Sequence, residues 1–162
     1  MSFEHPSSPF PKNRDKLWLN ISLKPTTMTL DHVAIWTNNI EESRAWYMKY
    51  FGGRSNEKYT NEKKQFQSYF LTFQMGARLE IMTKTGISAN LNDTVTNQHL
   101  GIIHLAFGVA TMKEVDEKAK ELEAEGYIIL SGPRKTGDGC YEFETLDPDR
   151  NRIEVTTKCA ED

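Results

Sequence analysis

The feature that most constrains this chain is an internal repeat of spacing and chemistry. A histidine opens a strand-like stretch in each half, His32 in HVAIWT and His104 in HLAFGV, and the two lie 72 residues apart. Later in each half a glutamate lies in another strand-like stretch, Glu80 in LEIM and Glu154 in IEVTT, and each follows a glycine by 28 residues. Self-similarity at a fixed spacing is typical of a duplicated supersecondary unit. The chain is therefore predicted to contain two copies of one unit.

A helix follows the histidine strand in each copy. Seven residues after each histidine comes a capping signal, Asn39 with Glu42 and Thr111 with Glu114. A side chain that accepts from an amide of the first turn favours the start of a helix. Each predicted helix runs to a glycine, which suits a left-handed C-terminal cap. Two further strands then precede each glutamate strand, so the unit is βαβββ.

Two such units predict an α+β fold with eight strands and two helices. Each helix has to cover the apolar face of its sheet, so the polar faces look the other way. We expect a curved mixed eight-stranded sheet around a cleft, with the helices on the outer face. Within it, 54–59 is predicted as a strand and 131–139 as a Gly-rich loop. A row of aromatic residues in the first helix is predicted to pack in the core: Trp46, Tyr47, Tyr50 and Phe51.

The repeat also predicts the domain organisation. Residues 1–27 fit neither copy, are rich in Pro, Ser and Lys, and are predicted to be a flexible, dispensable N-terminal extension. One domain follows over 28–159, with module one at 28–84, a polar linker at 85–99 and module two at 100–158.

Four side chains are candidate metal ligands. In a strand, alternate side chains share a face, so each lies opposite its apolar neighbours. Any one of them taken singly is better explained as a solvated glutamate or a hydrogen-bonded core histidine. Their shared register favours a single metal site instead. Two imidazoles and two carboxylates suit Ni, Co, Zn, Mn or Fe, and they lack the thiolates that select softer ions. The candidate ligands are His32, Glu80, His104 and Glu154.

Composition excludes several functions. The net charge is −3 with a pI near 5.8, and no basic stripe occurs, which argues against a nucleic-acid partner. No apolar run is long enough to predict a membrane span, and the N-terminus lacks a signal-peptide core. Cys140 and Cys159 make neither a disulfide framework nor a zinc motif, so a reducing cytoplasm is the default expectation.

The sequence resembles the vicinal oxygen chelate superfamily, and in particular its glyoxalase I-like members. The resemblance rests on HVAIWT, HLAFGV, LEIM and DPDRNRIEV, covers residues 28–158, and departs from the usual DPDGN ending at Arg150. It implies that the four candidate ligands bind one divalent metal. Each site takes ligands from two modules, which in many members belong to different subunits, so the resemblance also implies a homodimer.

The resemblance implies an activity as well. Ring-cleaving dioxygenases and fosfomycin-modifying members use two His and one Glu, whereas the fourth candidate, Glu80, matches bacterial-type glyoxalase I. This implies a metal-dependent lyase or isomerase that transfers a proton through a metal-chelated enediolate of a small 2-oxoaldehyde–thiol adduct. Glu154 is the first choice of general base and Glu80 the second. The alternatives are an epimerase of a 2-substituted acyl thioester and a ligand-sequestering protein of the bleomycin-resistance type.

Two positions depart from the glutathione-using members. Those members generally place Arg four residues after the first ligand and Asn four residues after the first Glu, where this chain has Trp36 and Lys84. By strand parity both side chains face the cleft. We therefore assign Trp36, Lys84 and Arg134 to substrate binding, and for Arg134 a solvated loop cation is an equal alternative. The thiol, and the substrate class with it, stays open.

Overall fold

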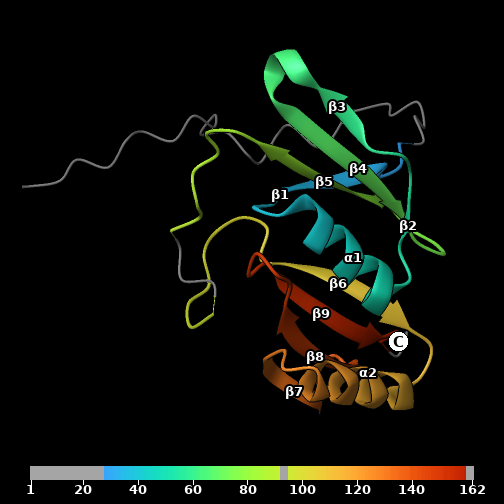
Figure 1. Ribbon diagram of the computed structural model, residues 1–162. Coiled ribbons are helices and arrows are strands. Elements are labelled where there is room, and N and C mark those ends of the chain that lie inside the picture. The colour runs from blue at the N-terminus through green and yellow to red at the C-terminus, as the bar shows by residue number, and fades with distance from the viewer. Residues whose placement is uncertain (1–27, 92–94, 160–162) are drawn as a thin grey trace, which may run out of the picture.

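The computed structural model describes residues 28–91 and 95–159 (Figure 1). The predicted N-terminal extension, 1–27, lies outside the described residues. Neither helix of the described part is long and apolar enough to cross a membrane.

Module one forms a sheet in the order β1-β5-β4-β2, with β3 paired to β4. β1 runs parallel to β5, and the other pairs are antiparallel. Its elements are β1 (His32–Trp36), α1 (Ile40–Phe51), β2 (Arg54–Ser55), β3 (Tyr59–Asn61), a 3₁₀ turn (Glu62–Lys64), β4 (Phe66–Thr72) and β5 (Arg78–Lys84).

Module two forms a sheet in the order β6-β9-β8-β7, again with the first and last strands paired in parallel. Its elements are β6 (His104–Val109), α2 (Met112–Ala124), β7 (Ile129–Lys135), β8 (Tyr141–Leu146) and β9 (Arg152–Thr157). The duplicated βαβββ unit and the α+β class are thereby confirmed.

Two details of the predicted architecture differ. In the described part of the chain nine strands divide between two sheets, one per module, instead of forming one eight-stranded sheet. The predicted strand 54–59 breaks after Ser55. There the side-chain oxygen of Asn56 accepts from the backbone amide of Phe70 at 2.8 Å. In a regular β2–β4 pair a backbone carbonyl would accept this hydrogen bond.

The predicted loop at 131–139 is wrong over its first half, because β7 extends to Lys135. This strand pairs with β8 through two register shifts, and Gly132, at a φ of +83°, lies in the second, between Ser131 and Arg134. A Cβ at Gly132 would lie 2.5 Å from the carbonyl oxygen of Glu142. The glycine therefore marks a bulge in a strand, a common use of glycine inside a sheet.

The predicted helix ends are confirmed. The side chain of Asn39 accepts from the amide of Glu42, and Gly52 closes α1 at a φ of +66°. Thr111 and Glu114 form a full capping box at the start of α2. These local signals need no tertiary partner, which explains why the sequence alone reveals them.

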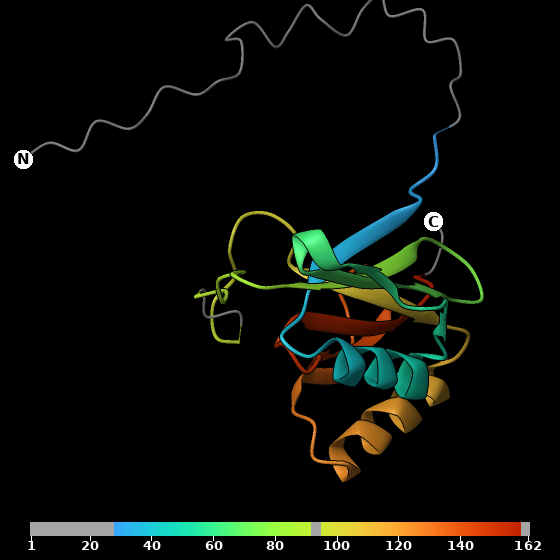
Figure 2. The same cartoon turned by 45° about the horizontal axis from the view of Figure 1, so that its top comes forward.

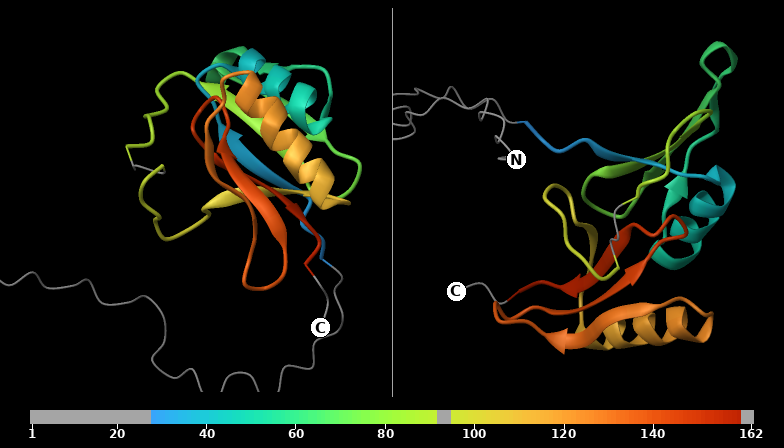
Figure 3. Two further views of the ribbon diagram at one scale, coloured as in Figure 1. Left: turned by 90° about the horizontal axis from the view of Figure 1, so that it is seen from below. Right: turned by 90° about the vertical axis from the view of Figure 1, so that its left-hand side faces the viewer.

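Helix α1 lies at the junction of the two modules (Figure 1). Its aromatic residues are core, as predicted: Tyr47 is fully buried and Trp46 is 3% exposed. They also contact module two, with ring centroids 4.4 Å apart for Phe51 and Phe107 and 6.0 Å apart for Trp46 and Tyr127. Both helices lie on the same side of the strands (Figures 2 and 3). α1 is thus shared between the modules, whereas α2 lies on the outside of module two.

Polar contacts from the turn before β9 complete this junction. Asp149 accepts from the backbone amide of Asn38 at 2.9 Å and from the hydroxyl of Ser43 at 3.0 Å. Asp147, which is 3% exposed, accepts from the hydroxyl of Tyr47. Burial raises the pKa of Asp147 above its usual value and holds the pKa of Tyr47 well above 10. The turn therefore fixes the start of α1 against module two.

Candidate metal-binding site

Module one places His32 and Glu80 next to each other on one sheet face. They come from the adjacent parallel strands β1 and β5, where Ala34 is the register partner of Glu80. His32 Nε2 lies 3.9 Å from Glu80 Oε2, and the Glu80 side chain is 15% exposed. The neighbouring Leu79 and Ile81 are buried on the opposite face against α1. Strand alternation thus sends the two polar groups to the face away from the helix.

Module two repeats this arrangement with His104 and Glu154. They lie on the adjacent parallel strands β6 and β9, with Ala106 opposite Glu154. His104 Nε2 lies 3.6 Å from Glu154 Oε2, and the Glu154 side chain is 14% exposed. We refer to the His32–Glu80 pair as half-site one and to the His104–Glu154 pair as half-site two.

The donor atoms of each half-site suit one divalent ion. Histidine nitrogen and carboxylate oxygen bind such ions at about 2.0–2.2 Å, so two ligands of one ion lie at most about 4.4 Å apart. Both measured separations fall within that limit. His32 is also oriented, because its Nδ1 lies 2.8 Å from Oδ2 of Asp31. A carboxylate behind a ligating imidazole turns the other ring nitrogen toward the metal.

Asp31 was not anticipated from the sequence. It is bound by His32 and also by the guanidinium of Arg78, and these hydrogen bonds lower the pKa of its carboxyl, with His32 as the larger cause. The available signal was an acidic residue directly before the first histidine. Module two has Ile103 at the equivalent position, so the two half-sites differ in this support.

The four predicted ligands are brought together in two pairs. Over residues 28–91 and 95–159, the only group of three or more His, Cys, Asp and Glu whose ligand atoms all lie within 4.8 Å is Asp138, Cys140 and Cys159. Half-sites one and two therefore do not form one four-ligand cluster within the chain. Each presents two donor atoms, so an ion bound there would take its remaining ligands from other groups.

Half-site two lies among charged side chains. Glu144, the register partner of Glu154, forms an ion pair with Arg152 at 3.0 Å, and Glu142 forms one with Arg134 at 3.3 Å. Burial raises the pKa of Glu154, and the two neighbouring glutamates raise it further, whereas His104 and Arg134 oppose the rise. Alternation in YEFETL was the signal that would have placed Glu142 and Glu144 on this face.

Half-site one lies beside aromatic side chains instead. The ring of His32 packs edge-on against Phe70 with centroids 5.3 Å apart. Trp36, which is 42% exposed, packs edge-on against Phe66 at 6.1 Å, and Met82 is its register partner. We call Trp36, Phe66, Phe70 and Met82 the aromatic wall.

The predicted substrate residues lie in three settings. Trp36 belongs to the aromatic wall. Lys84 lines a 470 Å³ pocket together with Phe66 and Asn61. Arg134 lies in strand β7 rather than in a loop, and its guanidinium is paired with Glu142 next to half-site two. The loop placement of Arg134 is therefore wrong, but its side chain is 48% exposed, so the solvated-cation alternative stays open.

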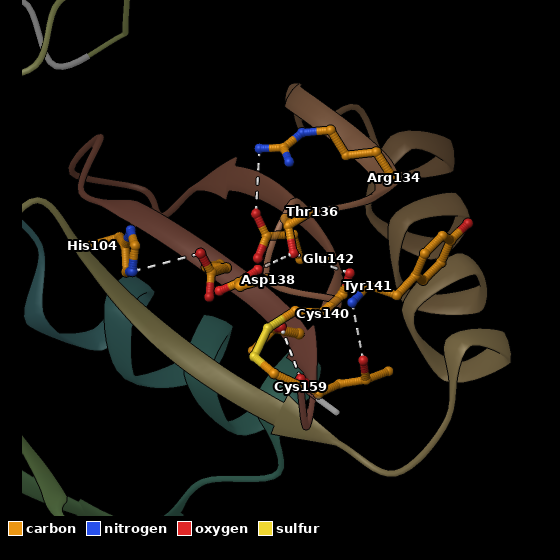
Figure 4. The surroundings of a disulfide bond; sticks show 11 residues. His104, Arg134, Thr136, Asp138, Cys140, Tyr141, Glu142 and Cys159 are labelled. Carbon is orange, nitrogen blue, oxygen red and sulfur yellow. Dashed lines mark hydrogen bonds and ion pairs between the residues drawn. A yellow bond between two sulfur atoms is a disulfide. The ribbon is translucent and has the colours of Figure 1, made fainter. Parts of the chain in front are cut away.

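The two cysteines also differ from expectation, because Cys140 and Cys159 are joined by a disulfide bond (Figure 4). Cys140 immediately precedes β8, and Cys159 follows the end of the antiparallel strand β9. Strand pairing brings the two sulfurs together across 19 residues of sequence. That proximity depends on the register of β8 and β9, which cysteine spacing alone does not reveal.

Comparison with known proteins gives consistent results. Residues 29–155 match the Glyoxalase/Bleomycin resistance protein/Dioxygenase superfamily. The uncharacterised protein YqjT of Bacillus subtilis strain 168 is 25% identical to this chain over 132 residues. These residues cover 78% of this chain and 96% of YqjT. Among the solved structures that share the fold are the following two. A glyoxylase/bleomycin resistance protein/dioxygenase domain from Frankia sp. EAN1pec has a TM-score of 0.67 at 17% identity, covering 82% of this chain and 98% of that one. The trypanothione-dependent glyoxalase I of Leishmania major has a TM-score of 0.64 at 18% identity, covering 81% and 87%.

Proposed function

The chain belongs to the Glyoxalase/Bleomycin resistance protein/Dioxygenase superfamily, and from this premise we propose that it is a divalent-metal-dependent lyase or isomerase of the glyoxalase I type. Its substrate would be a small 2-oxoaldehyde–thiol adduct or a related metabolite. The observation that carries the proposal is the pair of His–Glu half-sites, with donor atoms 3.9 Å and 3.6 Å apart. A ligand-sequestering protein without a metal has no need of two such pairs in equivalent strands.

We assign the metal to His32, Glu80, His104 and Glu154, in a site shared between two subunits. Since the half-sites do not meet within one chain, a second copy supplies the missing pair. In a symmetric dimer, half-site one of each subunit faces half-site two of its partner, which completes two identical sites. The bound ion would supply Lewis-acid polarisation of two neighbouring substrate oxygens.

The residues of the chain perform the proton transfer. By the resemblance to glyoxalase I, Glu154 is the first candidate, and its carboxylate lies 3.6 Å from Nε2 of His104 on the face away from the helices. It would remove a proton from the carbon next to a carbonyl and return it to the neighbouring carbon, acting as base and then as acid. Glu80 has the equivalent position in module one and is the second candidate.

The surroundings of the half-sites favour a substrate other than the glutathione adduct. The aromatic wall offers a flat apolar surface beside half-site one, and Trp36 stands where glutathione-using members generally have arginine. Lys84 and Arg134 remain as cations for an anionic group, although Arg134 is already paired with Glu142. A small thiol adduct of cytoplasmic metabolism fits these surroundings better than a tripeptide with two carboxylates.

The test combines metal binding with turnover. Metal-free protein is titrated calorimetrically with Ni²⁺ and then assayed with methylglyoxal premixed with a series of thiols. We expect the titration to show one Ni²⁺ bound per chain and the assay to show turnover of at least one of the methylglyoxal–thiol adducts. Single Ala variants of the four ligands should each lose at least about tenfold in affinity, whereas Glu117→Gln, an exposed glutamate on α2, should not. Four unchanged affinities would refute the metal site. Metal binding without turnover of any adduct would favour the epimerase or the sequestering protein.

A further inference from the structure

The disulfide at the end of β8 and β9 lies next to a third metal-competent group. The ligand atoms of Asp138, Cys140 and Cys159 all lie within 4.8 Å of one another. Figure 4 shows these residues together at the end of the strand pair that carries Glu142. Asp138 and Cys159 are exposed, whereas Cys140 is 5% exposed.

We propose that, once the disulfide is reduced, Cys140, Cys159 and Asp138 bind one soft divalent ion such as Zn²⁺. Two thiolates and one carboxylate are ligand types that zinc takes in proteins, and a water as fourth ligand completes four-coordination. The donor set differs from that of the half-sites, which offer imidazole and carboxylate but no thiolate. This site is separate from the proposed active site in both residues and chemistry.

The carboxylate is already held in position. Thr136 donates its hydroxyl to Oδ1 of Asp138 at 2.5 Å, and its backbone amide donates to the carbonyl of Cys140 at 2.9 Å. Gly139 donates back to the carbonyl of Thr136 at 3.1 Å, which closes a tight turn. Asp138 therefore needs little rearrangement to serve as a ligand.

The sulfurs have to separate only slightly. Bonded sulfurs lie about 2.05 Å apart, whereas two thiolates on one tetrahedral Zn²⁺ at about 2.3 Å lie roughly 3.8 Å apart. Cys159 can move by this amount because it is exposed and lies beyond Thr157, the last residue of β9. The strands stay together without the bond, since they pair from Glu142 to Leu146 and the amide of Tyr141 donates to the hydroxyl of Thr157 at 3.0 Å.

The disulfide-bonded protein and the metal-bound protein are mutually exclusive states of this site. Reduction adds two electrons and two protons to the sulfur–sulfur bond, and two molecules of a small thiol supply them and become a disulfide. Binding of the ion then displaces one proton from each of the two thiols. The oxidised protein has no thiolate to offer, so metal binding at this position reports the redox state of the pair.

Cadmium is the probe for the test, because Cd²⁺–thiolate bonds absorb in the ultraviolet whereas Cd²⁺ bound by imidazole or carboxylate does not. The full chain is stripped of metal and reduced with a phosphine, which becomes its oxide. We expect a saturable charge-transfer band, with the intensity of two thiolates per chain, that is displaced by Zn²⁺. Asp138→Asn should weaken binding by at least about tenfold, and Cys159→Ser should also halve the band.

Two controls keep the result specific. Glu123→Gln changes an exposed glutamate on α2 and should leave the band and the affinity unchanged. Protein kept oxidised should show no band. The proposal is overturned if the reduced protein gives no band while both thiols are free in a thiol assay, or if Asp138→Asn binds Cd²⁺ as tightly as the parent. Loss of metal at the half-sites does not affect this readout, so the two proposals fail independently.

Discussion

Tyr47 donates a hydrogen bond to Asp147 at 2.8 Å and so joins α1 of module one to the turn before β9 of module two. Both side chains are buried. Removing the hydroxyl in Tyr47→Phe leaves a buried carboxylate with one donor fewer. A hydrogen bond to a charged group contributes about 1.5–3 kcal/mol, and we expect the unfolding free energy from urea denaturation to fall by that amount at neutral pH.

The penalty of Tyr47→Phe should depend on pH. The Tyr47 hydrogen bond lowers the pKa of Asp147 against the effect of burial, so its loss raises the folded-state pKa further above 3.8. The penalty is then complete above both folded-state pKa values and shrinks as the pH falls through them. Denaturation at about pH 4 and at neutral pH measures this window. Tyr50→Phe is the matched control, because its acceptor Glu125 is 40% exposed, and it should cost less than about 1 kcal/mol. Equal penalties for both variants at both pH values would contradict the role of Tyr47.

Arg150 lies in the left-handed region at a φ of +67°, at the position where the resembling family commonly has glycine. A side chain with a Cβ is strained there by about 1–2 kcal/mol. Arg150→Gly removes the Cβ, whereas Arg150→Ala keeps it and removes only the rest of the side chain. We expect the glycine variant to be more stable than the alanine variant by about 1 kcal/mol, as measured by thermal or urea unfolding. An alanine variant of equal or greater stability would show that the turn carries no strain at this residue.

A mixing experiment tests whether the metal site is shared between subunits. One double variant lacks half-site one (His32→Ala with Glu80→Ala), and the other lacks half-site two (His104→Ala with Glu154→Ala). Neither should bind Ni²⁺ tightly alone. After the two are mixed and reassociated, half of the dimers are mixed and each has one intact site, so about a quarter of the sites should return. Sites that lie within one chain would not return at all, and that result would overturn the shared arrangement.

The proton-transfer assignment separates Glu154 from Glu80. With metal in excess, Glu154→Gln should retain bound metal yet lose activity by roughly 10²–10⁴-fold, the usual contribution of general acid–base catalysis. Glu80→Gln is the matched variant in module one and should lose less. Bound metal is measured on the same samples that are assayed. The reverse order of activities would assign the proton transfer to Glu80.

Glutathione should be a poor co-substrate. A charge-assisted hydrogen bond to a substrate carboxylate contributes about 1.5–3 kcal/mol, so the loss of one costs roughly tenfold or more in affinity. Trp36 offers no such bond, and Lys84 offers a point charge on a flexible stem instead of a bidentate fork. The measurement compares kcat/KM for methylglyoxal with glutathione, with smaller thiols and without thiol. A high efficiency with the glutathione adduct alone would show that this view of Trp36 and Lys84 is wrong.

Local chemistry explains which parts of the fold were predictable. The caps at Asn39 and Thr111 and the alternation around Glu80 and Glu154 act within a few residues, so the sequence shows them directly. The bulge at Gly132 was missed because the same glycine suits a loop as well as a strand, and only pairing with β8 decides between them. Pairing across strands also determines the disulfide.

The candidate site was predictable for the same reason and to the same extent. Strand parity identifies His32, Glu80, His104 and Glu154 as inward-facing side chains, and their separation into two half-sites depends on how the modules pack. The ion pairs of Glu142 with Arg134 and of Glu144 with Arg152 likewise depend on register between strands that are distant in sequence. Charge neutralisation at half-site two is therefore visible only in the folded chain.

The sharing of α1 between the modules has a consequence for synthesis on the ribosome. Asp147 lies 100 residues after Tyr47, and Phe107 and Tyr127 also come long after the helix. At roughly 5–20 residues per second, about 5–20 s pass between synthesis of Tyr47 and synthesis of Asp147. During this interval the aromatic side chains of α1 that pack against module two lack their native packing partners. We therefore expect the nascent chain to be most prone to aggregation before its second half has left the ribosome.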